Sequence, residues 1–379
     1  MVYRNIIVGI DLQTDAPQIC YFDMASRKTG ARPMKIGNLP VDLREVMSDE
    51  EHLAAEKNIK TLAGILREAL ATVGIRDIKR EIVGLMFTVR DLSKPMVALL
   101  RSVFEELEIP KSRAFMQEYK ESLYYYTMYQ KQEIWKHNAA CFEIHDGNKV
   151  CFYALGVNRK TAPLTVAVKA EEKGRIGDRP EEKGPAFAKI LRDTLSKDIF
   201  SSVFVTGDQL SEEWALEAKK VLVKGGRPAF TEEFIFARGA CYSAREKADE
   251  KRIRGIAFSG DMLVKDNIGM IMQVGEKTAY YPLISAGVHW YNAQHDCEFM
   301  LGDQKRVVFV VSSSREGGRR LCKMELPGLP DRPERTTRLR MHVEFESKSR
   351  CVATVEDMGF GEMFPASGKV WSELLEGVR

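Results

Sequence analysis

The sequence predicts an α/β protein of two related lobes followed by a smaller all-β domain. Three observations lead to this fold class. Apolar strand-like runs and amphipathic helical patterns alternate through residues 1–255, as in proteins built on a parallel sheet. Two strand-loop-strand units, at residues 6–22 and 140–155, divide this part into similar halves. Between residues 262 and 365, short alternating runs are separated by Gly, Pro, Asp and Ser, which is typical of an antiparallel β-sandwich.

Composition places the chain among globular proteins and narrows its partners. It has 379 residues, 44% of them hydrophobic, which is enough for two or three domains. The 57 basic and 54 acidic residues are mixed along the chain, so no extended basic field is available to bind nucleic acid. Seven scattered cysteines without a C-x-x-C pair favour reduced thiols. With neither a secretory leader nor a membrane-length apolar run, we expect a cytoplasmic protein that binds neither nucleic acid nor membrane.

The first lobe is expected to span about residues 1–138. Its apolar run from residue 6 to 10 breaks at Asp11 and resumes at Gln18, as two strands joined by a loop would. Apolar residues then recur every three or four positions until Gly74, which predicts a long helix with a glycine cap. The continuous apolar run 81–89 predicts a buried strand. Further along, we expect helices at residues 93–107 and 117–128 and a short strand at residues 113–115.

The second lobe is expected to span about residues 139–255. Asp146 and Gly147 stand between two alternating apolar runs, which is a strong hairpin signal. Residues 169–184 are charged and are expected to form a solvated loop. A buried strand at residues 203–206 and helices at residues 187–195, 211–222 and 231–247 complete this lobe. The β-domain is expected at residues 256–366, and a short helix around Trp371 and Leu374 at residues 367–379.

With both halves laid out, the order of motifs resembles the actin-like ATPase superfamily, and within it the DnaK-type chaperones most closely. Residues 9–14 resemble the family's first phosphate loop, and residues 143–148 its second. Residues 117–123 resemble the connecting helix. Residues 203–208 resemble the adenosine strand, and residues 236–240 the helix behind it. In the β-domain, residues 262–266 stand where the interdomain linker would be. Residues 281–284, 325–330 and 340–355 are similar to strands and a turn of the chaperone substrate domain. The resemblance covers nearly the whole chain in order.

The resemblance implies an actin-like ATPase fold with reduced outer subdomains, ATP bound between the lobes, and a β-domain that binds a peptide or protein partner. Asp11 and Glu143 would hold magnesium through water. The residues implied to contact nucleotide or metal are Asp11, Gln13, Thr14, Glu143, Gly147, Gly207 and Gly239. Purely structural roles are the alternative for these residues, with Asp11 capping a turn, Glu143 as a solvated strand residue, and Gly207 and Gly239 serving close packing.

Several departures from the family pattern bear on activity. Gln13 stands where the family has a glycine, and Glu143 stands where it has an aspartate. Asp146 adds a negative charge to the second loop, where repulsion of a triphosphate is worth on the order of a few kcal/mol. Residues 23–79 and 156–202 are too few for the outer subdomains that close over nucleotide.

Two functions are therefore open. The first is a chaperone-type protein that couples ATP binding to peptide binding and is at most a weak ATPase. The second is an inactive pseudo-ATPase scaffold or adaptor that binds a protein partner. A third and weaker alternative is an actin-like assembly factor.

Overall fold

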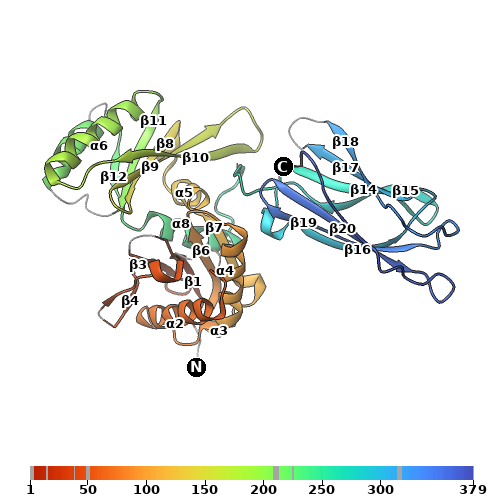
Figure 1. The fold of residues 1–379 in the computed structure, drawn as a ribbon. Helices are drawn as coiled ribbons and strands as arrows, with labels where there is room; N and C mark the ends of the chain where they lie inside the picture. Colours follow the sequence, from red (N-terminus) through yellow and green to blue (C-terminus); the bar gives the residue numbers. More distant parts are fainter. Residues whose placement is uncertain are drawn as a thin grey trace. The chain divides into compact units, whose positions relative to one another are not determined.

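The protein is described by a computed structural model that covers residues 4–13, 16–37, 39–47, 52–207, 213–223, 226–248, 250–313 and 318–378. It divides into two compact units, Met1–Gly260 and Asp261–Arg379. In Figure 1 the first unit is coloured red to green and the second cyan to blue. Within the described ranges, no helix is long and apolar enough to cross a membrane.

The described part of the first unit contains two large sheets, and the first of them has the strand order β3-β2-β1-β6-β7. Its strands are β1 (Ile6–Asp11), β2 (Gln18–Asp23), β3 (Lys28–Pro33), β6 (Ile82–Val89) and β7 (Ala114–Glu118). Strand β1 is antiparallel to β2 and parallel to β6, which is parallel to β7. The carboxyl ends of β1, β6 and β7 therefore meet at one edge of the sheet. All of β1 is buried, as its continuous apolar run predicts.

The second sheet repeats this topology, with the order β12-β11-β8-β9-β10-β13. Its strands are β8 (Asn138–His145), β9 (Lys149–Asn158), β10 (Leu164–Arg175), β11 (Phe200–Gly207), β12 (Ala229–Thr231) and β13 (Ile256–Phe258). Strand β9 is antiparallel to β8 and β10, whereas β8, β11 and β12 are mutually parallel. Read from β10, this order and these directions match the first sheet. The structure thus has the two similar halves that the paired hairpins predict.

Helices α5 (Tyr119–Met128) and α8 (Ile235–Lys247) pack against each other between the two sheets (Figure 1). Helix α8 also packs on β1, β2 and β6, whereas α5 packs on β10. The approach of α8 to β1 requires a glycine, because a Cβ at Gly9 would lie 2.2 Å from the backbone nitrogen of Cys241. The crossing of α8 with α5 requires another, because a Cβ at Gly239 would lie 1.9 Å from the carbonyl oxygen of Ser122.

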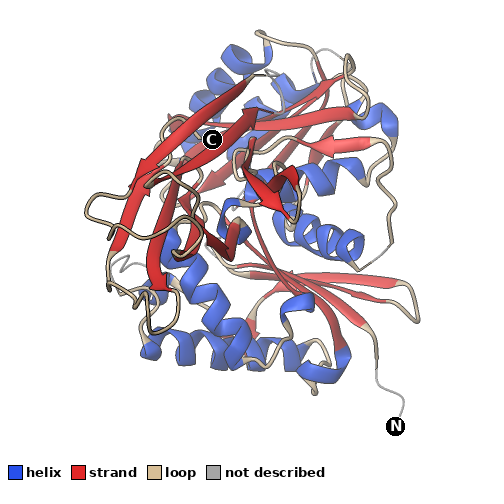
Figure 2. Cartoon of the chain, turned by 90° about the vertical axis from the view of Figure 1, so that its right-hand side faces the viewer, coloured by secondary structure: helices blue, strands red, loops and turns tan. Residues whose placement is uncertain are grey.

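The remaining helices flank the two sheets, as the blue helices beside the red strands show in Figure 2. They are α1 (Arg44–Met47), α2 (Glu56–Thr72), α3 (Ile78–Glu81), α4 (Lys94–Glu106), α6 (Pro180–Leu195) and α7 (Leu216–Val223). Short 3-10 helices lie at Lys111–Arg113, Gln132–Trp135, Glu213–Ala215 and Trp290–Asn292. Strands β4 (Lys35–Ile36) and β5 (Leu39–Pro40) form a small separate ladder.

The second unit contains two four-stranded antiparallel sheets, ordered β15-β14-β17-β18 and β16-β19-β20-β21. Their strands are β14 (Asp266–Val274), β15 (Lys277–Ile284), β16 (Gln294–Met300), β17 (Arg306–Ser313), β18 (Arg319–Glu325), β19 (Arg338–Ser347), β20 (Arg350–Gly359) and β21 (Val370–Leu374). Buried residues alternate with more exposed ones along β19 and β20. This alternation is the pattern that sandwich packing produces.

Two expectations about local structure are wrong. Within the segment 367–379, residues 370–374 form strand β21 instead of a helix. They pair with the edge of β20, from Glu356 opposite Val370 to Val352 opposite Leu374. The charged segment 169–184 is not a loop. Strand β10 continues to Arg175 and stays paired with β9, with a register shift between Glu172 and Gly174. Helix α6 starts at Pro180, a residue suited to the first turn. The charges are tolerated because this end of β10 is exposed.

Candidate interlobe site

Four polar side chains converge where the two lobes of the first unit meet. Asp11 ends β1, Arg90 directly follows β6, and Tyr119 opens helix α5 after β7. Glu143 comes from β8 of the second sheet. We call these four residues the interlobe cluster. Its members come together because parallel strands bring their carboxyl ends to one edge of each sheet.

A salt bridge between Arg90 and Glu143 connects the two lobes. The Nη1 and Nη2 atoms of Arg90 donate to the two carboxylate oxygens of Glu143 at 2.8 and 2.7 Å. The Glu143 side chain is only 2% exposed, and it also accepts a hydrogen bond of 3.0 Å from the hydroxyl of Tyr153. Burial alone would lower the pKa of Arg90, but the combined interactions with Glu143, Tyr119 and Tyr153 raise it. Arg90 is therefore a permanent cation paired with a buried acceptor.

Asp11 is fully buried and is held by two donors. The hydroxyl of Tyr119 donates to its Oδ1 atom at 2.5 Å, and the backbone N–H of Gln13 donates to the same atom at 3.1 Å. Among the residues that the structure describes, its Oδ2 atom has no hydrogen-bond partner. Burial raises the pKa of Asp11 to about 7, although both hydrogen bonds act in the opposite direction. Close to neutral pH, this carboxyl group is therefore poised between its charged and neutral forms.

Aromatic and polar contacts fill the space around the cluster. The rings of Tyr119 and Phe236 stack with centroids 3.9 Å apart. The guanidinium carbon of Arg90 lies 5.0 Å from the centroid of the Tyr119 ring, within the range of a cation-π interaction. The side-chain oxygen of Gln13 accepts a hydrogen bond of 2.6 Å from the backbone N–H of Arg90. The cluster is thus tied to helices α5 and α8 as well as to the strand ends.

The structure brings together only part of the predicted site. Asp11, Gln13 and Glu143 lie in or beside the cluster, whereas Thr14 is outside the described residues. Gly147 lies in the β8-β9 turn, where its carbonyl oxygen accepts a hydrogen bond of 2.8 Å from Arg175.

The two glycines expected at the adenosine site make tight backbone contacts. Gly207 has a φ of +99°, and a Cβ there would lie 1.9 Å from the carbonyl oxygen of Ile144. Gly239 packs just as closely on Ser122 of helix α5. For both glycines, these contacts agree with the alternative role in close packing.

Sequence reasoning missed Arg90, Tyr119 and Tyr153. Arg90 had a usable signal, because it ends the buried run 82–89 as Asp11 ends the run 6–10. Its partner Glu143 is 53 residues away and on the other sheet, so no local pattern pairs them. Tyr119 and Tyr153 stand in apolar patterns that single out neither residue, and only the fold shows that their hydroxyls reach carboxylates.

The arrangement of these residues does not fit a magnesium nucleotide. Glu143 already accepts two hydrogen bonds from Arg90 and one from Tyr153, and the guanidinium neutralises its charge, so it attracts a hydrated metal ion only weakly. A carboxyl group must be deprotonated to bind a cation, and burial raises the pKa of Asp11. Gln13 is turned to the backbone of Arg90. To admit a metal and a triphosphate, the cluster would have to rearrange.

A second candidate site lies in the unit Asp261–Arg379, where the ladder between β14 and β17 stops early. Pairing ends with Met270 opposite Phe309. Beyond it β14 continues to Val274 and β17 to Arg306, paired only with their other neighbours β15 and β18. A hollow of about 540 Å³ fills this gap, and we call it the β14–β17 hollow. Its lining includes residues 270–273, 298–302, 306–308, 334 and 335.

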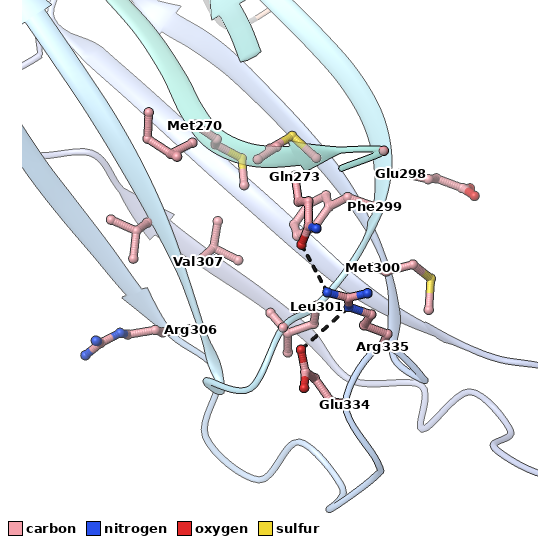
Figure 3. A pocket seen from close by; sticks show the side chains of 15 residues that line it. Met270, Gln273, Glu298, Phe299, Met300, Leu301, Arg306, Val307, Glu334 and Arg335 are labelled. Atoms are coloured by element: carbon pink, nitrogen blue, oxygen red, sulfur yellow. Dashed lines mark hydrogen bonds and ion pairs between the residues drawn. The ribbon is translucent and has the colours of Figure 1, made fainter. Parts of the chain in front are cut away.

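Figure 3 shows that apolar and charged side chains both line the β14–β17 hollow, with Arg306 and Arg335 among the latter. Phe299 and Leu301 line it together with Met270 and Val307. The guanidinium of Arg335 donates a hydrogen bond of 3.0 Å to the side-chain oxygen of Gln273. It also faces Glu334, with 3.6 Å between Nε and Oε1.

Several solved structures resemble the chain at low sequence identity. The inorganic polyphosphate/ATP-glucomannokinase of Arthrobacter sp. strain KM is 10% identical, with a TM-score of 0.38 over 64% of this chain and 98% of the kinase. Component A of the (R)-2-hydroxyglutaryl-CoA dehydratase of Acidaminococcus fermentans is 11% identical, with a TM-score of 0.37 over 65% of this chain and 100% of that chain. A Ppx/GppA family member from Aquifex aeolicus is 13% identical, with a TM-score of 0.32 over 54% of this chain and 66% of that chain. No curated protein matches the sequence.

Family comparisons cover most of the sequence. Residues 263–376 match a domain of unknown function, DUF8552. Residues 43–261, more than half of the 379-residue chain, match the C-terminal part of the family of unknown function DUF5716. The chain therefore belongs to the family of unknown function DUF5716.

Proposed function

We propose that this protein is a non-hydrolysing scaffold with an actin-like arrangement of two lobes, and that its β-unit binds an extended segment of a protein partner. The observation that carries this proposal is the salt bridge between Arg90 and Glu143. In this salt bridge the guanidinium of Arg90 occupies the place beside Glu143 that a bound metal ion would take at the lobe junction.

The free energy needed to separate Arg90 from Glu143 disfavours nucleotide binding at the interlobe cluster. Breaking a buried ion pair by withdrawing one partner costs about 3–5 kcal/mol. Nucleotide would have to overcome this cost before it gained any contact, and the penalty corresponds to about two to four orders of magnitude in affinity. Asp11 adds a smaller cost, because burial raises its pKa to about 7 and a carboxyl group must lose its proton to bind a metal. A lobe junction stabilised in this way suits a rigid scaffold.

The partner site proposed for the β-unit is the β14–β17 hollow. Three further residue pairs would be needed to continue the ladder from Met270 and Phe309 to the end of β17. An extended peptide could supply backbone hydrogen bonds to the two open strand edges, as in strand addition. Apolar side chains of that peptide would enter the hollow against Phe299 and Leu301.

Calorimetric titration of the full chain with ATP and magnesium tests the absence of nucleotide binding. We expect no saturable heat at millimolar nucleotide, because Arg90 and Glu143 stay paired. The ATP-coupled alternative predicts the opposite result, a saturable heat that disappears in an Asp11→Ala variant whose circular dichroism spectrum is unchanged. That pair of results would overturn the scaffold proposal.

Binding of labelled peptides tests the β14–β17 hollow. Fluorescence anisotropy with uncharged heptapeptides that carry a central Leu or Phe should show saturable binding to the full chain. Met300→Trp adds a bulky ring to the lining and should weaken binding about tenfold, which is about 1.4 kcal/mol. Met363→Trp is the matched control, because Met363 is 85% exposed and lies outside the lining. Equal affinities of both variants would rule out the hollow as the binding site.

A further inference from the structure

The outward face of the sheet β15-β14-β17-β18 has an apolar centre. Residues that pair directly in a ladder share a face of the sheet. Pairing places Tyr280 beside Ile271 on one row, and Gly269, Val310 and Leu321 in line on the next. Tyr280, Ile271 and Leu321 are 43%, 53% and 61% exposed. Large apolar side chains gathered on a sheet face mark an interaction surface more often than scattered ones do.

A hollow opens beside the tyrosine of this face. A Cβ at Gly269 would lie 2.4 Å from Cζ of Tyr280, so the ring lies directly over the glycine. The hollow has a volume of about 270 Å³, and its lining includes Tyr280, Asn267, Ser312 and Arg319. An amide, a hydroxyl and a guanidinium are donors suited to a carboxylate.

Cations surround the apolar centre. Three basic residues lie on the same face as Val310 and Leu321, because every second residue of a strand points to the same side. Along β17 and β18, the pairs on this side are Arg306 with Glu325, Val308 with Lys323, and Ser312 with Arg319. Among the described residues these three cations form no ion pair, and the buried Nε atom of Arg306 has no hydrogen-bond partner. Within the described part of these strands, the face therefore carries three cations and one anion, Glu325.

We propose that this basic sheet face, made by Ile271, Tyr280, Arg306, Arg319, Leu321 and Lys323, docks an acidic amphipathic segment of a protein partner. Apolar side chains of the segment cover the tyrosine, isoleucine and leucine, and one of its carboxylates enters the hollow beside Arg319. A purely apolar partner would leave three cations desolvated without counter-charges, which is costly. A nucleic acid would leave the apolar centre uncovered. Only an acidic and apolar segment matches both features.

The proposal deepens the scaffold function and rests on it only in requiring a protein partner. The basic sheet face borders the β14–β17 hollow through Ile271 and Arg306, which line that hollow as well. Arg319, Lys323 and Leu321 are not part of the hollow lining. Substitutions at these three positions therefore test the face separately from the hollow.

The test uses two labelled peptides, one of alternating Glu and Leu and one of alternating Lys and Leu, titrated with the full chain in fluorescence anisotropy. The Glu-Leu peptide should bind, and its affinity should fall as salt rises because the contact is partly between charges. The double variant Arg319→Glu/Lys323→Glu should lower this affinity at least about tenfold. The Lys-Leu peptide should not bind to the unmodified chain.

Two further variants keep the test decisive. Lys219→Glu/Lys220→Glu makes the same charge change on exposed residues of α7 and should leave binding unchanged. Leu321→Ser removes an exposed apolar contact without opening the core, so it should weaken binding even if the double variant folds poorly. Met300→Trp should leave Glu-Leu binding intact, which separates this face from the hollow. Equal affinity of all variants, equal affinity for both peptides, or no binding of the Glu-Leu peptide would overturn the proposal.

Discussion

Replacing Arg90 with methionine is expected to lower the free energy of unfolding of the first unit by about 3–5 kcal/mol. The reason is that Glu143, 2% exposed, would be left as a buried carboxylate without its counter-charge. For a unit of this size, such a loss lowers the melting temperature by about 6–20 °C. Methionine keeps the apolar stem of arginine, so the measured change reports mainly the loss of the ion pair. Differential scanning calorimetry of the full chain measures it.

The matched control for Arg90 is Arg80 on the same lobe. Arg80 lies 3.6 Å from Asp77, and both side chains are largely exposed. Exposed pairs of this kind contribute at most about 1 kcal/mol, so Arg80→Met should hardly change the melting temperature. If Arg90→Met behaved like Arg80→Met, the Arg90 salt bridge would not be holding the lobes together.

The second large effect is expected for Gly9→Ala. A Cβ at this position would lie 2.2 Å from the backbone nitrogen of Cys241 and 2.5 Å from the carbonyl oxygen of Ala237. Both are backbone atoms, so the whole of α8 would have to move away from β1. Overpacking of a buried contact costs about 1–3 kcal/mol, and a clash with helix backbone belongs at the upper end of that range. Chemical denaturation should show a loss of about 3 kcal/mol.

Gly64→Ala provides the contrast for Gly9→Ala. Gly64 lies in helix α2, and a Cβ there meets no atom within 4 Å. Alanine has a higher helix propensity than glycine by about 1 kcal/mol, so this variant should be as stable as the unmodified chain or more so. A stability of Gly9→Ala equal to that of Gly64→Ala would show that α8 is not in close contact with β1.

Patterns that are local in sequence predicted much of the fold. The apolar run that ends at Asp11 and the Asp146-Gly147 turn indicated two hairpins, and the two sheets repeat one topology around them. This works because buried strands and tight turns depend on a few adjacent residues. The expectation of α/β architecture followed from the same alternation.

Errors arose where tertiary pairing overrides local preference. Residues 370–374 form a strand because β20 offers them an edge, although the sequence around Trp371 and Leu374 was interpreted as helical. The charged end of β10 is a strand because β9 pairs with it. Neither partner is visible in the segment itself, and β-propensity depends strongly on such context.

The candidate site shows the same division. Asp11 and Glu143 were selected from the sequence, and the structure places both at the lobe junction. What they do there is set by residues that the sequence pattern did not single out. Tyr119 reaches Asp11 from 108 positions away, and Arg90 reaches Glu143 from 53 positions away. Local patterns can locate a polar residue at a strand end, but the identity of its partner requires the fold.

The most direct test of the account is a double-mutant cycle at the lobe junction, using Arg90→Met, Glu143→Leu and the combined variant. Arg90→Met leaves the buried carboxylate of Glu143 unpaired and Glu143→Leu leaves the half-buried guanidinium of Arg90 unpaired, so the first should cost about 3–5 kcal/mol and the second somewhat less. The combined variant removes both charges and should recover most of that loss, giving a coupling energy above about 2 kcal/mol. Additive losses, with a coupling energy close to zero, would contradict the account, because the two lobes would then not be joined through this pair.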